Sequence, residues 1–372
     1  MTAQHRFRIA AAVGALVAPL ALVATSVAPA DAAGAKHKHD VYIYKAEKNL
    51  KLKGVGTDTV GDTTMPTLSC NSGDVVLDGM WVVKHVDQYQ PPQADPDEDP
   101  DFPSTDTTGG IYNDERDVHV VASYPDQVDS RKWNFQIENR AYGDAQVKLY
   151  VTCIRGYTEY TNSHRHQVKV TNATPIATST IDHPSWPGSR SYYEWGGAPC
   201  ASAAGVNTEY FVAPGFKLDS AATDHRLVGS YPKYGSNGLA WTWEFGGTGL
   251  TSGTFYGKCI SRKVLSGASH VHALGMAHMP SSNPTAGHLT SIPAGDPYEV
   301  QYSCDQDNDS WSGYKAAVGW FWMGNYWQHN WFLGMEPRPK TRAYSFWNGG
   351  AASASVTIGT LCINSRTANP IF

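Results

Sequence analysis

Short runs in which apolar and polar residues alternate recur along most of this 372-residue chain. Clear examples are Val118 to Ala122, Trp133 to Ile137, Gln146 to Thr152, Gln167 to Val170 and Ala240 to Phe245. A period of two places apolar side chains on one face of a strand, whereas few segments show the spacing of 3.6 that an amphipathic helix needs. The 35 Gly and 22 Pro residues supply turns between the runs. The pattern therefore predicts an all-β protein.

The runs fall into three copies of one pattern. Each copy contains a strand-like segment that ends in Pro, and these segments are residues 120–125, 227–232 and 332–337. About eight residues later each copy has an alternation of aromatic residues, at 133–135, 241–243 and 344–346. A cysteine followed by Ile then closes each copy. The chain is therefore an internal repeat of three units.

The six cysteines fit this repeat. In an exported protein, cysteines are interpreted first as disulfides, and here one cysteine opens and one closes each copy. Pairing within the copies predicts the bridges Cys70–Cys153, Cys200–Cys259 and Cys304–Cys362. By loop-closure arguments, each bridge would contribute about 4 kcal/mol to stability.

A His-x-His motif stands at the same place in each copy. In the second and third copies it begins eleven residues after the cysteine that closes the preceding copy. The six histidines are His37, His39, His164, His166, His270 and His272. We therefore expect domain boundaries at 36–162, 163–268 and 269–372, with an acidic insertion at 90–110 in the first domain and many aromatic residues in the third.

Each copy offers about seven short alternating runs and a bridge between its ends, which is typical of an Ig-like sandwich. The expected architecture is three tandem Ig-like β-sandwich repeats, each with one intradomain disulfide.

The His-x-His motifs are candidate metal ligands. In a strand, both imidazoles of such a motif point to one face, about 6.5–7 Å apart. They can supply two ligands to Zn²⁺ or Cu²⁺ if a third comes from a neighbouring strand. Candidates for the third ligand are His183, His225, His278, His288, Asp40 and Asp182. The spacing selects none of them, and the alternative is that the histidines begin an interdomain strand and only pack or hydrogen-bond there.

Calcium fits the sequence less well. Asp305, Asp307 and Asp309 alternate like the start of a calcium loop, but Ser310 replaces the required Gly and Ala316 replaces the closing Glu. The acidic run 95–101 is interrupted by Pro and predicts a solvated loop that could hold calcium loosely or meet a basic partner.

The aromatic residues of the third copy suggest a ligand site. Trp320 and Trp322 share one face of a predicted strand and are expected in the core. Tyr326, Trp327 and Trp331 are the candidate ligand-binding residues, because exposed Trp and Tyr side chains stack on sugar rings or protein partners. Core packing is the alternative.

The beginning of the chain predicts export. Two basic residues, Arg6 and Arg8, precede an apolar run that ends at an A-x-A cleavage pattern at 30–32, so residues 1–32 are expected to be a signal peptide. Removing Arg6, Arg8 and Asp31 changes the formal net charge from −5 to −6. A weakly acidic chain argues against nucleic acid or an anionic membrane as partner. No second run of 18 apolar residues follows, so no membrane span is expected after cleavage.

Catalytic motifs are largely missing from the sequence. It has no nucleophile elbow, no H-E-x-x-H pattern and no phosphate-binding loop. Glu194, Glu244 or Glu336 could pair with an Asp for glycoside hydrolysis, but no spacing selects one. An enzyme is therefore not the favoured interpretation.

The export signal, the cysteine-bounded β-units, the S-Y-P turns and the W-x-F/W strands together resemble secreted proteins of actinobacteria that have no established activity. The resemblance implies no site residues. We expect a secreted extracellular binding or structural protein with a glycan or protein ligand. The alternatives are a secreted metal-binding protein that uses the His-x-His strands, and a glycan-active enzyme.

Overall fold

The protein is described from a computed structural model. The described residues are 38–55, 61–86, 115–141, 143–161, 163–178, 191–194, 200, 202–203, 206–207, 209–219, 226–233, 240–246, 252–264, 270–280, 286–295, 297–306, 312–324 and 329–371. The predicted signal peptide and the acidic insertion at 90–110 lie outside them. Within the described ranges the chain is almost entirely β-strand, with one short 3-10 helix, which confirms the predicted fold class. No described helix is long and apolar enough to span a bilayer.

The strands follow the three copies, which we call units 1, 2 and 3. Unit 1 contains β1 (Ile43–Leu52), β2 (Thr63–Thr64), β3 (Thr67–Ser69), β4 (Val75–Val86), the 3-10 helix η1 (Glu115–Asp117), β5 (Val118–Pro125), β6 (Lys132–Asn139) and β7 (Ala145–Ile154). Unit 2 contains β8 (Val170–Asn172), β9 (Ile176–Thr178), β10 (Ser191–Glu194), β11 (Ser202–Ala203), β12 (Val206–Asn207), β13 (Glu209–Leu218), β14 (Arg226–Pro232), β15 (Trp241–Gly246), β16 (Gly253–Ser261) and β17 (Lys263–Val264). Unit 3 contains β18 (Val271–Met279), β19 (His288–Ile292), β20 (Tyr298–Ser303), β21 (Tyr314–Trp322), β22 (Asn330–Pro337), β23 (Thr341–Asn348) and β24 (Ala354–Ile371).

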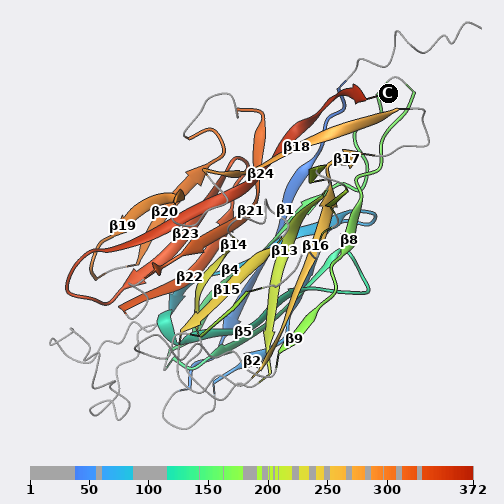
Figure 1. Ribbon diagram of the computed structural model, residues 1–372. Helices are drawn as coiled ribbons and strands as arrows, with labels where there is room; N and C mark the ends of the chain where they lie inside the picture. The colour runs from blue at the N-terminus through green and yellow to red at the C-terminus, as the bar shows by residue number, and fades with distance from the viewer. Residues whose placement is uncertain are drawn as a thin grey trace, which may run out of the picture.

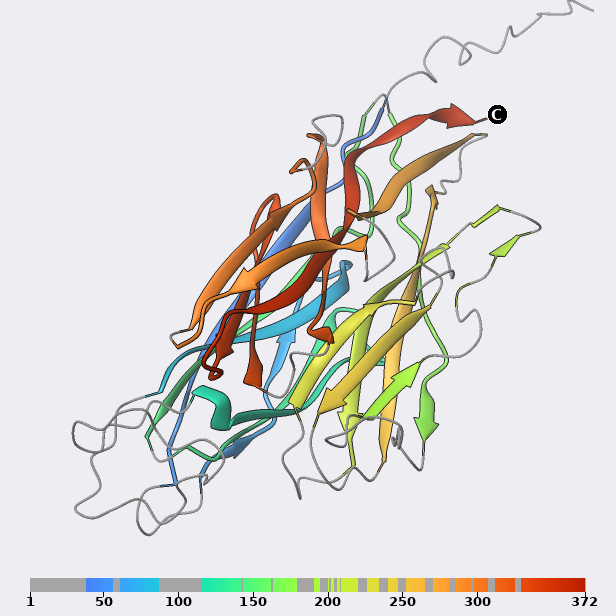
Figure 2. The ribbon, with the colours of Figure 1, turned by 60° about the vertical axis from the view of Figure 1, so that its left-hand side comes forward.

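Each large sheet combines strands of two units. The first has the order β1-β7-β4-β22-β23-β20 and joins units 1 and 3. The second, β10-β15-β14-β21-β24-β18-β17, joins units 2 and 3, and the third, β2-β6-β5-β13-β16-β8, joins units 1 and 2. The pairing is cyclic, because each unit shares one sheet with each of the other two, and strands of all three units lie side by side (Figures 1 and 2). We call the line around which the three units are arranged the central axis.

The three separate Ig-like sandwiches that we expected are not confirmed. In every unit, the strand formed by the repeated segment (β5, β14 or β22) pairs with a strand of its own unit along one edge. Along its other edge it pairs with a strand of a neighbouring unit. The contacts are short: Gly334 pairs with Val82 between β22 and β4, and Phe216 pairs with Ser123 between β13 and β5. Alternation within a strand shows which face is buried but not which strand lies beside it, so the sequence pattern could not reveal this exchange.

The repeated segments bend at equivalent places. A β-bulge interrupts the register at Val120/Ala122 in β5, at Leu227/Gly229 in β14 and at Phe332/Gly334 in β22. A bulge increases the local twist of a strand. The extra twist helps the strand to pair with its own unit on one edge and with a neighbouring unit on the other.

The serine and the aromatic residues of the repeat pack together in the core. The indole Nε1 of Trp133 donates to Ser123 Oγ at 2.9 Å, and Trp241 donates to Ser230 Oγ at 2.9 Å. Both indoles are fully buried, so their N–H groups need these acceptors. Gly79 lies against the Trp133 ring, where a Cβ would approach the ring to 2.2 Å.

The three predicted disulfides are present. Their Cα–Cα distances are 5.8 Å for Cys70–Cys153, 5.4 Å for Cys200–Cys259 and 5.9 Å for Cys304–Cys362. No free cysteine remains.

Candidate metal centre

The second histidine of each His-x-His motif lies at the central axis. We call His39, His166 and His272 the inner histidines, and all three have an exposed fraction of 0%. Their ring centroids lie 4.6 Å apart for His39–His166, 5.0 Å for His39–His272 and 4.5 Å for His166–His272. The three units therefore each contribute one imidazole to a compact triangle.

Backbone pairing between successive units holds the triangle. The residue five positions after each closing cysteine meets the inner histidine of the next unit. Thr158 and His166 exchange two hydrogen bonds, from His166 N to Thr158 Oγ1 at 3.0 Å and from Thr158 N to His166 O at 2.9 Å. In the following unit, Val264 is the strand partner of His272.

The first motif closes the ring. His39 N donates to Thr367 Oγ1 at 3.0 Å, and Thr367 N donates to His39 O at 2.9 Å. Thr367 lies five positions after Cys362, the closing cysteine of unit 3. The start of unit 1 therefore pairs with the end of unit 3, in the same way that units 2 and 3 each pair with the end of the unit before them. Beside this pair, Val41 N donates to Ser365 O at 2.8 Å. We call the pairing of 38–42 with 364–367 the closing seam.

Hydrogen bonds orient two inner rings toward the shared space. Nδ1 of His39 lies 3.2 Å from the carbonyl oxygen of Glu159, and Nδ1 of His272 lies 2.8 Å from that of Ala368. A carbonyl oxygen only accepts, so Nδ1 carries the proton and Nε2 keeps the lone pair that a metal needs. Both carbonyls stand six positions after the closing cysteine of the same unit. The equivalent residue of unit 2, Leu265, lies outside the described residues.

The Nε2 atoms of all three inner histidines are buried without a hydrogen-bond partner. A buried polar nitrogen normally has a partner, so three such atoms in one histidine cluster indicate a ligand of the kind that accepts imidazole lone pairs.

Two further histidines form an outer layer. His164 and His270 lie 5.0 Å apart by ring centroid, and His164 lies 4.7 Å from His39. Ser163, with φ 69°, makes the left-handed turn just before His164. One ring nitrogen each from His39, His164, His166 and His272 can be chosen so that all four lie within 4.8 Å of one another. His37, the sixth predicted histidine, lies outside the described residues.

Burial favours the neutral form of His39, His166 and His270. Burial is the main cause that lowers the pKa of His39 and of His270, and it lowers the pKa of His166 to about 3. Neighbouring histidines add to the effect, because a second positive charge nearby disfavours protonation. Neutral imidazole is the form that binds a metal.

The donor set defines which metals fit. Among the described residues the cluster contains imidazoles only, without thiolate or carboxylate. Imidazole suits Zn²⁺, Cu²⁺ and Ni²⁺, whereas Ca²⁺ and Mg²⁺ prefer oxygen. With Zn–N bonds of about 2.0–2.1 Å, tetrahedral ligand nitrogens stand about 3.4 Å apart. The four nitrogens would therefore move inward by about an ångström or less on binding.

No protein-family model matches the chain, and the search of curated proteins found no match. The assignment of this centre therefore depends on its geometry alone.

The three candidate third ligands that are described, His278, His288 and Asp40, are not in the cluster. Each inner histidine instead contacts the inner histidines of the other two units. His278 is buried beside Tyr210 and Trp241, with ring centroids 5.9 and 6.2 Å away, and burial lowers its pKa to about 3. Asp40 pairs with Arg366 at 2.8 Å. The remaining candidates are His288, which packs on Tyr302, and His183, His225 and Asp182, which lie outside the described residues.

The threonines and carbonyls that support the triangle were missed by sequence analysis. Thr158, Thr367 and Ala368 belong to no motif. Their constant offset of five or six residues from the closing cysteine was the signal that would have identified them.

The other predicted sites receive less support. Of the candidate calcium loop, Asp305 is described, but Asp307 and Asp309 lie outside the described residues, as does the acidic run 95–101. The second cluster of possible metal ligands, Cys200, Glu209 and Cys259, is not a metal site, because both cysteines are in a disulfide.

The candidate carboxylates for glycoside hydrolysis have structural partners. Glu244 accepts from Tyr231 Oη at 2.8 Å and from Trp322 Nε1 at 3.1 Å. Glu336 lies 3.4 Å from Lys45 Nζ and 3.3 Å from Lys84 Nζ. The side chain of Glu194 lies outside the described ones.

Among the candidate ligand-binding aromatics, only Trp331 is described, and it is 8% exposed instead of open to solvent.

Proposed function

We propose that this protein is an extracellular metal-binding protein that holds one divalent transition metal, Zn²⁺ or Cu²⁺, at the central axis. The observation that carries the proposal is the triangle of inner histidines, each fully buried and each with an unpartnered Nε2 atom. The site requires one residue from each unit, so a single repeat could not form it.

A structural role suits this centre better than a catalytic one. Three inner histidines and His164 supply four nitrogen donors, which is the number in closed structural zinc sites. A catalytic zinc instead keeps one position open for water or substrate. The metal would join the three units at a point where hydrogen bonds between neighbouring units already connect them.

The extracellular location is part of the proposal. It is supported by the predicted signal peptide at 1–32 and by three disulfides, since such bridges persist in oxidising compartments.

Metal analysis tests the proposed function. The full chain, secreted by a bacterial host and never exposed to a chelator, should carry close to one equivalent of zinc or copper by mass spectrometry. His166→Ala should lose most of this metal, because it removes a fully buried ligand. His85→Ala is the matched control, since His85 is exposed on β4 and far from the cluster in sequence.

Folding must be checked before the result is interpreted. Disulfide content and circular dichroism should be unchanged in His166→Ala, and His166→Gln offers a second variant with a polar side chain. Less than about 0.2 equivalents of metal in the wild type, after supply of zinc and of copper, would contradict the proposal.

A further inference from the structure

The histidine cluster is buried to different depths. The three inner histidines are 0% exposed, and His270 of the outer layer is 8% exposed. His164 is half-buried, and its neighbours Ser163 and Arg165 are exposed. Among the described residues, solvent therefore reaches the cluster through the outer layer and not through the inner triangle.

His270 lies beside the cluster without belonging to its closest set of donors. Its ring centroid lies 5.0 Å from that of His164, and 5.2 Å from those of His166 and His272. The four nitrogens that lie within 4.8 Å of one another come instead from His39, His164, His166 and His272. His270 is therefore close enough to pass an ion to the site, but four other donors can hold the ion there.

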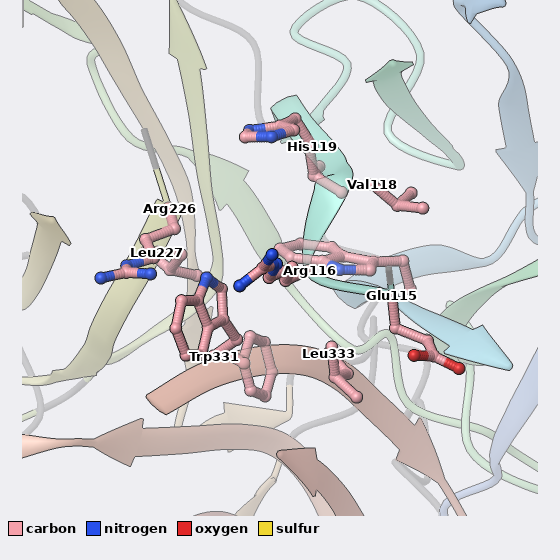
Figure 3. Close-up of a pocket in the computed structure, with 11 residues that line it drawn as sticks. Glu115, Arg116, Val118, His119, Arg226, Leu227, Trp331 and Leu333 are labelled. Carbon is pink, nitrogen blue, oxygen red and sulfur yellow. The ribbon is translucent and has the colours of Figure 1, made fainter. Parts of the chain in front are cut away.

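The central axis has a second end that an ion might have used. The histidine cluster lies near the C-terminal end of β24, where Pro370 is the strand partner of His272. The three units meet a second time toward the opposite end of the molecule (Figure 1). The residue just before each repeated segment lines this second junction, and these equivalent residues are His119, Arg226 and Trp331 (Figure 3).

The second junction is a poor entrance for a cation. Its pocket has a volume of about 30 Å³, which is space for only a few waters and not for a hydrated ion. The side chains that line it include two guanidinium groups, of Arg116 and Arg226, against the one carboxylate of Glu115. Positive groups repel a divalent cation, so we place the entrance at the histidine end.

A metal ion must lose its water to enter a buried site. Moving a charge out of water is costly unless other groups replace the lost solvation. Imidazoles of the outer layer can replace the waters one at a time. A neutral imidazole has two ring nitrogens, so one can bind the ion while the other keeps its existing contacts.

We propose that His270 is a transfer ligand, which binds the incoming metal ion on the solvent side and passes it to His164 and the inner triangle. This inference rests on the proposed metal-binding function. At each step an imidazole nitrogen replaces a water or the preceding imidazole on the ion, without any change of oxidation state. The role is kinetic, because His270 speeds entry and release of the ion and adds little to its final affinity.

Isotope exchange measures this role on the full chain loaded with zinc. The loaded protein is mixed with isotopically enriched zinc, and the replacement of its bound ion is followed by mass spectrometry. His270→Ala should slow the exchange by about tenfold or more, because one ligand on the path is lost. Its equilibrium affinity for zinc, measured by competition with a chelator, should be nearly unchanged.

Further variants separate transfer from simple obstruction. If the ring of His270 only blocks the path, His270→Ala should speed the exchange and His270→Phe should slow it. If the ring transfers the ion, both substitutions should slow the exchange, because both remove the nitrogen donor. His270→Asp restores a ligand atom and should recover part of the rate. His288→Ala is the control, because His288 packs on Tyr302 outside the cluster.

Two results would overturn the proposal. One is exchange in His270→Ala that is as fast as in the wild type or faster. The other is a large loss of zinc affinity in His270→Ala, which would make His270 a ligand of the final site. Absence of metal from the wild type would instead reject the proposed function, and the transfer role with it. Circular dichroism and disulfide content show that each variant is folded.

Discussion

Removal of the metal should weaken the closing seam before any other part of the fold. Three hydrogen bonds hold the seam. His39 N donates to Thr367 Oγ1 at 3.0 Å, Thr367 N donates to His39 O at 2.9 Å, and Val41 N donates to Ser365 O at 2.8 Å. The seam joins residues that are 328 positions apart, whereas the equivalent pair of Thr158 and His166 is only eight positions apart. Coordination of His39 together with the other inner histidines would add a direct link across this seam.

The size of the effect follows from binding linkage. A ligand present at one hundred times its dissociation constant stabilises the folded state by about 2.7 kcal/mol. For about 340 residues the unfolding entropy is roughly 0.7 kcal/mol per kelvin. Chelation should therefore lower Tm by about 4 °C. Each backbone hydrogen bond in the seam contributes only about 1 kcal/mol net, so the metal would be comparable to the whole seam.

Hydrogen exchange with mass spectrometry is the assay. After chelation, amides of 38–42 and 364–367 should exchange faster, while those of the ten-residue pairing between β1 and β7 should be unchanged. Restoring zinc should restore protection. One equivalent of metal could bind while its removal changes neither Tm nor the exchange rate of the seam amides. That result would show that the metal does not hold the seam, and it would leave the proposed metal site unchanged. A chain that binds no metal would instead reject the proposed function.

Three other perturbations test the fold. Arg342→Met should cost about 3–5 kcal/mol in urea unfolding, because it leaves Asp78 buried without the guanidinium now 3.3 Å away; replacing both by apolar residues should recover most of the loss. Burial lowers the pKa of Lys258 to about 8, so the folded state binds this proton more weakly than the unfolded state does. As pH rises from 8 to about 10.5, the free energy of unfolding of the wild type should therefore increase relative to that of Lys258→Met. A flat difference would show that Lys258 titrates normally. Ser123→Ala should cost about 1–3 kcal/mol by thermal or urea unfolding, since it removes the acceptor of the Trp133 indole N–H; no change would mean that water replaces the serine.

The sequence predicted those features that depend on spacing along the chain. The strands followed from alternation, and the disulfides followed from the position of one cysteine at each end of a copy. The sequence analysis proposed the His-x-His motifs as metal ligands but did not predict that His39, His166 and His272 converge, because the motif fixes two side chains on one face but not the partner strand. For His39 that partner strand contains Thr367, which lies 328 positions away in sequence. Cyclic exchange between units is a property of packing, and no local pattern encodes it.

The two junctions on the central axis differ in a way that their chemistry explains. At the first junction all three copies have histidine, so each unit can offer the same ligand to the proposed metal. At the second junction the equivalent positions carry three different residues, His119, Arg226 and Trp331, so that junction offers no set of three identical ligands.

Equivalence at the metal centre is itself testable. His39→Ala, His166→Ala and His272→Ala each remove one fully buried ligand of the same triangle, so each should weaken zinc binding by a similar factor, within about threefold in calorimetry. The Nε2 atoms of all three are buried without a partner, and Nδ1 of His39 and of His272 bond to carbonyls at the same offset, so we expect the three histidines to contribute similarly. If one of the three substitutions left zinc affinity unchanged, the metal would lie off the axis, and His164 or His270 would take the place of the missing ligand.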